Sequence, residues 1–203
     1  MGATEILVGI VILGILAVGF VGLWVIGTYN SLVGKDTNTE NMWAKVQTAY
    51  QRRADLIPNL VDSVKEAKNF EKDTQTEIAQ MRSQAGQAKI DMSNAKDAEQ
   101  LQAANSQMSS VLARLMVVVE AYPDLKSNAN FLALQDEIAG TENRVKWERD
   151  EYNTAVKDYK LAVRTFPTNI MAGMFGFSQE KWKMFQAEAG ADKAPDVGAA
   201  FKE

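Results

Sequence analysis

One arginine on an apolar helical face is the first residue of this chain that could do chemistry. In YQRRADLIPNLVDSVK, residues 50–65, the apolar side chains recur at spacings of three and four, and Arg53 falls on the same spacing. A guanidinium group donates several hydrogen bonds and costs much free energy when it is buried without a partner. The position therefore predicts that Arg53 meets either acceptors or a water channel inside the fold.

A second group of polar residues lies on a later helical pattern, TENRVKWERDEYN, residues 141–153. Glu142, Arg149 and Asn153 follow one another at spacings of seven and four, which places them roughly on one stripe of a helix. Glu148 lies on the main apolar face. These residues are the candidate partners of the buried arginine.

We predict that Arg53 pairs with Glu142 or Glu148, and that Asn59 and Asn153 form hydrogen bonds in the same layer. Removing one member of a buried ion pair typically costs about 3–5 kcal/mol. Two alternatives stay open at this point. The charges could flank the helical seam and face water, or the polar layer could line a ligand groove.

Pro58 interrupts the same segment without shifting the phase of the apolar residues. If Pro58 opened a new helix, Ile57 would be its N-cap, for which isoleucine is a poor choice. One helix with a proline kink is therefore the better prediction. The kink leaves the carbonyl of Ala54 without its usual donor, at a cost of about 3 kcal/mol.

The composition excludes several kinds of chemistry. The 203 residues include no cysteine and no histidine, which excludes disulfides, thiol nucleophiles, imidazole bases and zinc sites built from these ligands. Glu142 and Glu148, the best carboxylate pair, are about 9 Å apart along one helix and have no carboxylate motif opposite them. A net charge of −4 does not favour nucleic acid. We expect no enzyme activity, no cofactor and no metal.

An uncharged apolar run occupies Ile6–Ile26. Its 21 residues would span roughly 31 Å as a helix, which matches the hydrocarbon core of a bilayer. The run is too long, and its N-terminal flank MGATE too poor in Lys and Arg, for a typical cleaved signal peptide. We predict a retained transmembrane helix, with Trp24 and Tyr29 as aromatic anchors at one interface.

Positive charge near the apolar run lies only on its C-terminal side, at Lys35 and Lys45. Lysine and arginine close to a span favour the cytoplasm. This pattern predicts a single-pass protein of the bacterial cytoplasmic membrane, with its N-terminus outside and the remainder in the cytoplasm.

The rest of the chain shows helical periodicity. It shows no convincing alternation of apolar and polar residues of the kind that predicts a strand. Helices are expected from near Thr39 to residue 67, over 78–92, over 101–122 and over about 126–166, and Pro167 stops the last. The fold class is all-α, an N-terminal transmembrane helix followed by an antiparallel up-and-down four-helix bundle. The expected divisions are an anchor (1–28), a membrane-proximal connector (29–41), the bundle (42–167), an apolar C-terminal segment with a short helix starting at Ser178 (168–190), and a flexible tail (191–203).

The apolar C-terminal segment must be hidden somewhere. It could close one end of the bundle, meet another copy of the chain or lie on lipid. The candidates for assembly or lipid contact are Met174, Phe175, Phe177, Trp182 and Phe185.

Five stretches of this sequence resemble the LemA family of bacterial membrane proteins, in the order in which they occur there. They are YNSLV, YQRRADLIPNLVDSVK, YPDLKSNANFLALQDEIAGTEN, RDEYNTAVKDY and FPTNIMAGMFGF. The resemblance implies an N-terminal transmembrane helix, a short outside N-terminus and a cytoplasmic up-and-down helical bundle. It implies no catalytic residue, because the family motif offers none. Relatives in the family are linked to membrane organisation and often look like companions of membrane proteases.

Three functions are consistent with these features. The leading hypothesis is a non-enzymatic, membrane-anchored scaffold that forms homo-oligomers or organises other membrane proteins. The second is an adaptor or regulator of a membrane protease or signalling partner. The third is membrane remodelling through the region from Ile170 to Phe185. The expected partners are the lipid bilayer, further copies of the chain and another membrane protein.

Overall fold

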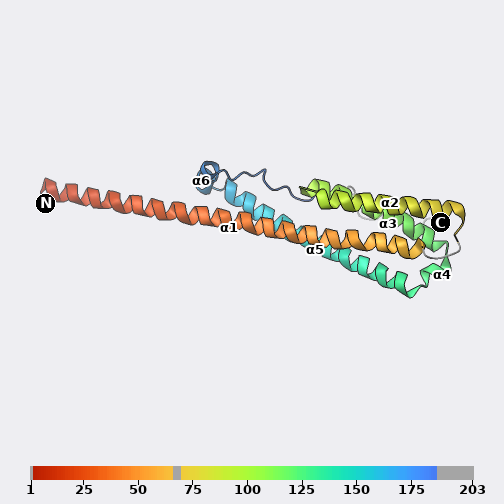
Figure 1. Ribbon diagram of the computed structural model, residues 1–203. Helices are drawn as coiled ribbons and strands as arrows, with labels where there is room; N and C mark the ends of the chain where they lie inside the picture. The colour runs from red at the N-terminus through yellow and green to blue at the C-terminus, as the bar shows by residue number, and fades with distance from the viewer. Residues whose placement is uncertain (1, 66–69, 187–203) are drawn as a thin grey trace, which may run out of the picture.

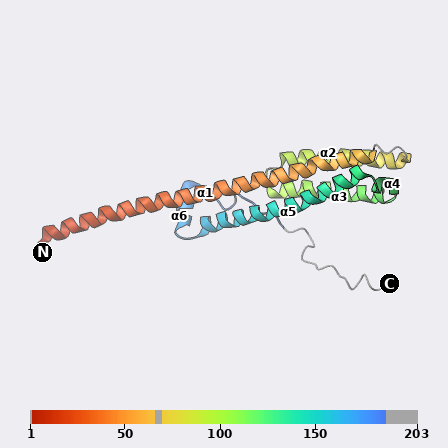
Figure 2. The ribbon, with the colours of Figure 1, turned by 90° about the horizontal axis from the view of Figure 1, so that it is seen from below.

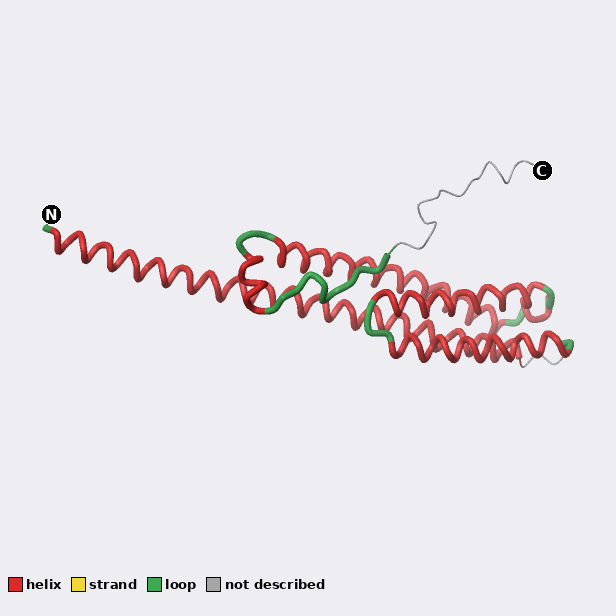
Figure 3. Tube along the Cα trace, turned by 90° about the horizontal axis from the view of Figure 1, so that it is seen from above, coloured by secondary structure: helices red, strands yellow, loops and turns green. Residues whose placement is uncertain are grey.

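The computed structural model describes residues 2–65 and 70–186. Within these ranges the chain forms helices and loops only, as Figure 3 shows. The helices are α1 (Ala3–Lys65), α2 (Lys72–Asn94), α3 (Ala98–Glu120), α4 (Pro123–Lys126), α5 (Ala129–Arg164) and α6 (Thr168–Phe175). The expected tail, 191–203, lies outside the described residues.

Helices α1, α2, α3 and α5 run alternately up and down along one rod (Figure 1), so the predicted all-α bundle is confirmed. Helix α1 packs along α5 on one side and along α2 on another, and α2 packs along α3. The backbones of α3 and α5 approach each other less closely than these pairs do. The side of the bundle between α3 and α5 is therefore its most open seam.

Helix α1 has 63 residues and is roughly 95 Å long. Its N-terminal part projects beyond every other helix in both views (Figures 1 and 2). In the described part of the chain it is the single helix long and apolar enough to cross a membrane, and none of its most apolar window is buried. The predicted span is thus present as an exposed, all-apolar helical cylinder.

The expected start of a helix near Thr39 is wrong, because α1 runs without a break through 29–41. Thr39 is fully buried, and its hydroxyl donates to the carbonyl of Lys35, one turn back (2.9 Å). A hydroxyl used in this way does not cap a new helix. Leu32 is also buried, so the polar stretch carries its own packed face and continues the helix into the bundle.

Pro58 lies inside α1, as the unbroken phase of the apolar residues predicted.

Two clusters of buried apolar residues form the core of the rod. The larger joins α1, α2, α3 and α5 around residues such as Tyr50, Met81, Leu115 and Tyr152. The smaller joins Leu32, Tyr159, Val163 and Ala172 near the C-terminal end of the exposed span.

The C-terminal segment is also arranged differently from the prediction. The short helix is α6, and no helix begins at Ser178 in the described residues. Helix α6 ends at Phe175 and is capped by Gly176, whose φ of 79° lies in the left-handed region that glycine tolerates best. From there residues 178–186, which we call the C-terminal strap, run without regular structure back along the bundle. Residues 187–190 of the expected apolar C-terminal segment lie outside the described residues.

Candidate functional site

Arg53 is the buried charge at the centre of the rod. Its side chain is 3% exposed, because its position on α1 points it inward with the apolar residues. Its Nη1 donates to Oδ1 of Asn105 (2.6 Å) and its Nη2 to Oγ of Ser109 (3.1 Å). Both acceptors belong to α3. The main partners of the guanidinium are therefore neutral.

The two acidic residues that we predicted as partners of Arg53 lie in different surroundings. An oxygen of Glu142 is 3.9 Å from Nη2 of Arg53, but the Glu142 side chain is 65% exposed. Such a contact at the rim of a site contributes little to stability. Glu148 is buried on α5 and pairs with Arg144, one turn away (2.7 Å), rather than with Arg53.

The acceptor that sequence reasoning missed had a visible signal. Asn105 falls on the apolar spacing of the segment 101–122, where a lone amide among leucines and methionines needs an inward partner. Asn59, which we expected in the same layer, is exposed on α1. The structure thus brings Arg53 together with α3 residues and not with Asn59.

Asn153 and Arg149 contact the C-terminal strap. Asn153 forms a reciprocal pair with the backbone of Phe185: its Oδ1 accepts from the Phe185 amide (2.9 Å) and its Nδ2 donates to the Phe185 carbonyl (3.2 Å). Arg149 donates to the carbonyl of Gln186 (3.0 Å) and lies over the Phe185 ring, 5.1 Å from its centroid. Arg149 and Asn153 of α5 therefore bind the backbone of the strap.

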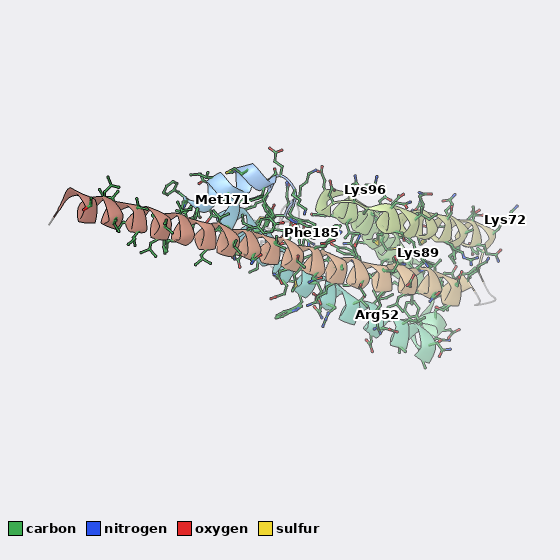
Figure 4. All side chains as sticks on the ribbon, turned by 60° about the vertical axis from the view of Figure 1, so that its left-hand side comes forward. Arg52, Lys72, Lys89, Lys96, Met171 and Phe185 are labelled. Atoms are coloured by element: carbon green, nitrogen blue, oxygen red, sulfur yellow. The ribbon has the colours of Figure 1, made fainter. Side chains whose placement is uncertain are left out.

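Phe185 anchors the strap between helices α1 and α5, in the middle of the rod (Figure 4). Its ring is 5% exposed, stacks on Trp43 and Tyr50 at 6.1 Å each, and meets Tyr152 edge to face at 5.6 Å. The Tyr152 hydroxyl donates to the Lys183 carbonyl (3.0 Å). Burial is the main cause that raises the pKa of Tyr152, to about 12.

Two ion pairs fix the middle of the strap. Lys183 lies 3.0 Å from Asp97, the N-cap of α3, and Lys181 lies 2.6 Å from Asp36 on α1. The Gln100 amide and then Lys183 lower the pKa of Asp97. The bond to Asp97 in turn raises the pKa of Lys183. The strap is therefore tied to α1, α3 and α5 together.

A cleft of about 620 Å³ lies above Arg53, on the open seam between α3 and α5. Its walls include cations and carboxylates in nearly equal measure, together with amides from both helices and the end of the strap: Arg53, Lys146, Arg149, Glu142, Asp150, Asn105, Asn143, Asn153 and Gln186. Such a lining suits polar peptide groups or zwitterions. It offers neither histidine nor cysteine as a nucleophile or base.

The five candidates for assembly or lipid contact separate into two groups. Phe185 is buried, and Phe177 and Trp182 are partly buried against the apolar clusters. Met174 and Phe175 on α6 remain 72% and 47% exposed. The strap thus closes the bundle, whereas α6 leaves apolar side chains uncovered.

Comparison with known proteins agrees with this architecture. A profile of the LemA family matches residues 42–198. Protein LemA of Metamycoplasma hominis is 28% identical over 158 residues, which cover 78% of this chain and 69% of that protein. Magnetosome protein MamQ 2 of Paramagnetospirillum magneticum is 25% identical over 195 residues, covering 86% of this chain and 71% of that protein. These matches indicate no enzyme family. A membrane-type apolar helix, a helical bundle and a family match over three quarters of the sequence lead to one conclusion: this chain belongs to the LemA family.

Proposed function

We propose that this protein is a non-enzymatic, membrane-anchored helical scaffold that self-assembles or organises other membrane proteins. The observation that carries the proposal is the continuity of α1. One unbroken helix forms the exposed apolar span and then a full side of the bundle core, from Leu32 to Val64. An anchor without a flexible joint keeps the bundle in line with the transmembrane helix and close to the bilayer, which suits a rod that must present its sides to neighbours.

The surface of the rod supports association through its sides. Large apolar side chains are exposed along α5, with Leu132 43% exposed and Trp147 60% exposed. Exposed tryptophan is frequent at the centre of protein interfaces. One relative is named a magnetosome protein, which also supports a structural role.

The test uses the intact chain with its anchor. We expect chemical cross-linking in native membranes and sizing in mild detergent to give a defined oligomer. Trp147→Glu should lower the oligomeric fraction, whereas Lys72→Glu, at the far end of the rod, serves as the matched exposed control. A sharply monomeric species under both conditions would remove self-assembly from the proposal.

A second candidate function is an adaptor for another membrane protein, such as a protease. The cleft above Arg53 favours it, because its mixed polar lining can receive an extended segment of a partner beside the strap. Co-purification from native membranes separates the two functions. A stoichiometric second protein that is lost from a Lys146→Glu variant supports the adaptor, and purification of the chain with copies of itself alone supports the scaffold.

A further inference from the structure

The end of α5 and helix α6 form an apolar tip at one end of the bundle. We define the α5–α6 tip as residues 161–176. Within it, large side chains are exposed to an extent that is unusual for a water-soluble surface. They are Leu161 (62%), Phe166 (75%), Ile170 (54%), Met174 (72%) and Phe175 (47%). A cluster of this kind, as opposed to a single exposed leucine, marks a surface that meets another phase or molecule.

The tip lies at the level where the apolar run of α1 ends. The ring of Phe175 meets the ring of Tyr29 edge to face, with centroids 4.9 Å apart. Leu161 and Thr165 of the tip share a groove of about 580 Å³ with Trp24 and Thr28 of α1. The last apolar residue of the run is Ile26, so the tip sits beside the aromatic residues expected at a membrane interface.

The charges around the tip suit lipid headgroups. The last two turns of α5 carry Lys157, Lys160 and Arg164, with Asp158 as the single carboxylate among them. Basic residues directly behind an apolar insertion are attracted to the phosphates of an anionic leaflet. Figure 4 shows Met171, which marks α6, beside α1 and far from Lys72 at the other end of the rod. The apolar and basic groups of the tip thus lie at the membrane-proximal end.

Internal contacts hold the tip in this place. Asp36 of α1 accepts from Nε1 of Trp182 (2.8 Å) and pairs with Lys181 (2.6 Å). Met171 and Ala172 of α6 are buried against the bundle, while the other face of α6 stays uncovered. The exposed face is therefore preformed and does not require a conformational change to reach lipid.

We propose that the α5–α6 tip is a second membrane contact, whose apolar side chains enter the interface of the same bilayer that α1 crosses. Lipid is the occupant of choice because the uncovered face continues directly from the lipid-facing surface of α1. Attachment at two points would fix both the tilt and the rotation of the bundle on the membrane, which one helix alone does not fix. This inference is independent of whether the rods assemble with one another.

The absence of cysteine from the chain makes a clean test available. Single cysteines replace exposed residues in the full-length protein: Met174→Cys in the tip, Leu16→Cys in the span and Val117→Cys on the distant part of α3. Each variant is spin-labelled and reconstituted in vesicles of mixed zwitterionic and anionic phospholipids. Collision rates with oxygen, which enters bilayers, and with a water-soluble nickel chelate, which does not, then report the surroundings of each label.

We expect the ratio of oxygen to nickel accessibility of the Met174 label to be several-fold higher than that of the Val117 label and below that of the Leu16 label, which lies in the middle of the span. A Met174 label as accessible to nickel as Val117 would overturn the proposal. Protection of Met174 that disappears at tenfold higher lipid-to-protein ratio would also overturn it, since a second copy would then be the occupant. Exposure of the Leu16 label to nickel would do the same, because the height of the tip depends on an inserted span.

Discussion

At the scale of single residues, Arg53 is a charge held mainly by neutral oxygens. Asn105 and Ser109 supply these oxygens from α3, and Glu142 contributes only from the exposed rim. A hydrogen bond between a charged and a neutral group is worth about 1.5–3 kcal/mol when buried. The stabilising contribution at this layer should therefore follow the α3 acceptors and not the acidic residue.

Asn105→Leu should lower the free energy of unfolding by about 2–3 kcal/mol, because it leaves a buried guanidinium without its closest acceptor. Glu142→Gln should cost less than about 1 kcal/mol, since its side chain is mostly in water. Chemical denaturation in mild detergent, followed by circular dichroism, measures both. A larger loss for Glu142→Gln than for Asn105→Leu would show that the ion pair dominates after all.

The pair of Asp97 and Lys183 should make the stability of the fold depend on pH. The pKa of Asp97 is lowered below its ordinary 3.8 in the folded state, so its contribution is fully present above about pH 4 and is lost as the pH falls further. The pKa of Lys183 is raised above 10.5, so its contribution is lost only as the pH rises beyond that value.

Asp97→Asn keeps an N-cap for α3 but removes the charge that meets Lys183. We expect its melting temperature to be below that of the unaltered protein at pH 7 and equal to it near pH 2. Thermal scans at the two pH values provide the measurement. An equal deficit at both pH values would mean that the substitution acts through the cap and not through the charge.

At the scale of elements, the C-terminal strap completes a bundle that its helices leave partly open. Helices α2 and α3 have 23 residues each, and α5 has 36, so α1 and α5 extend together beyond the other pair. The strap fills this extension with Phe185 and with backbone hydrogen bonds to Asn153 and Arg149. The strap, which has no regular structure, thus covers the part of α1 and α5 that α2 and α3 do not reach.

Phe185→Ala should release the strap, since loss of a buried phenylalanine typically costs about 3–5 kcal/mol. We expect trypsin to cleave after Lys181 and Lys183 at least several-fold faster in this variant. Met184→Ala is the matched control, because Met184 is the neighbouring side chain and is 37% exposed. Equal cleavage rates in the two variants would contradict an anchoring role for Phe185.

At the scale of the whole molecule, α1 joins the membrane and the bundle in a single helix. Because the chain contains no native cysteine, its topology can be read by labelling. In intact cells a membrane-impermeant maleimide should react with Thr4→Cys and not with Val117→Cys, and both should react after the membrane is disrupted. The expectation follows from Lys35 and Lys45 on the bundle side. The reverse pattern would place the bundle outside.

The sequence by itself determined the apolar span, the helical class and the inward position of Arg53. These properties depend on residue type and on spacing along one helix, which a periodic pattern records directly. It also determined that Pro58 lies within a helix, because the apolar phase does not change across it. Thr39 misled the sequence reasoning, since a threonine that caps a helix and one that bonds back to a carbonyl look the same in a sequence.

Only the tertiary structure decided which groups meet. Whether Arg53 faces Glu142, Glu148 or Asn105 depends on how far α3 and α5 slide along α1, and that offset is set by packing over the whole bundle. The position of the strap could not be predicted from the sequence for a related reason. Its hydrogen bonds to α5 are made by the backbone of Phe185 and Gln186. Because backbone groups are the same in every residue, no pattern of side chains indicates where they will bind.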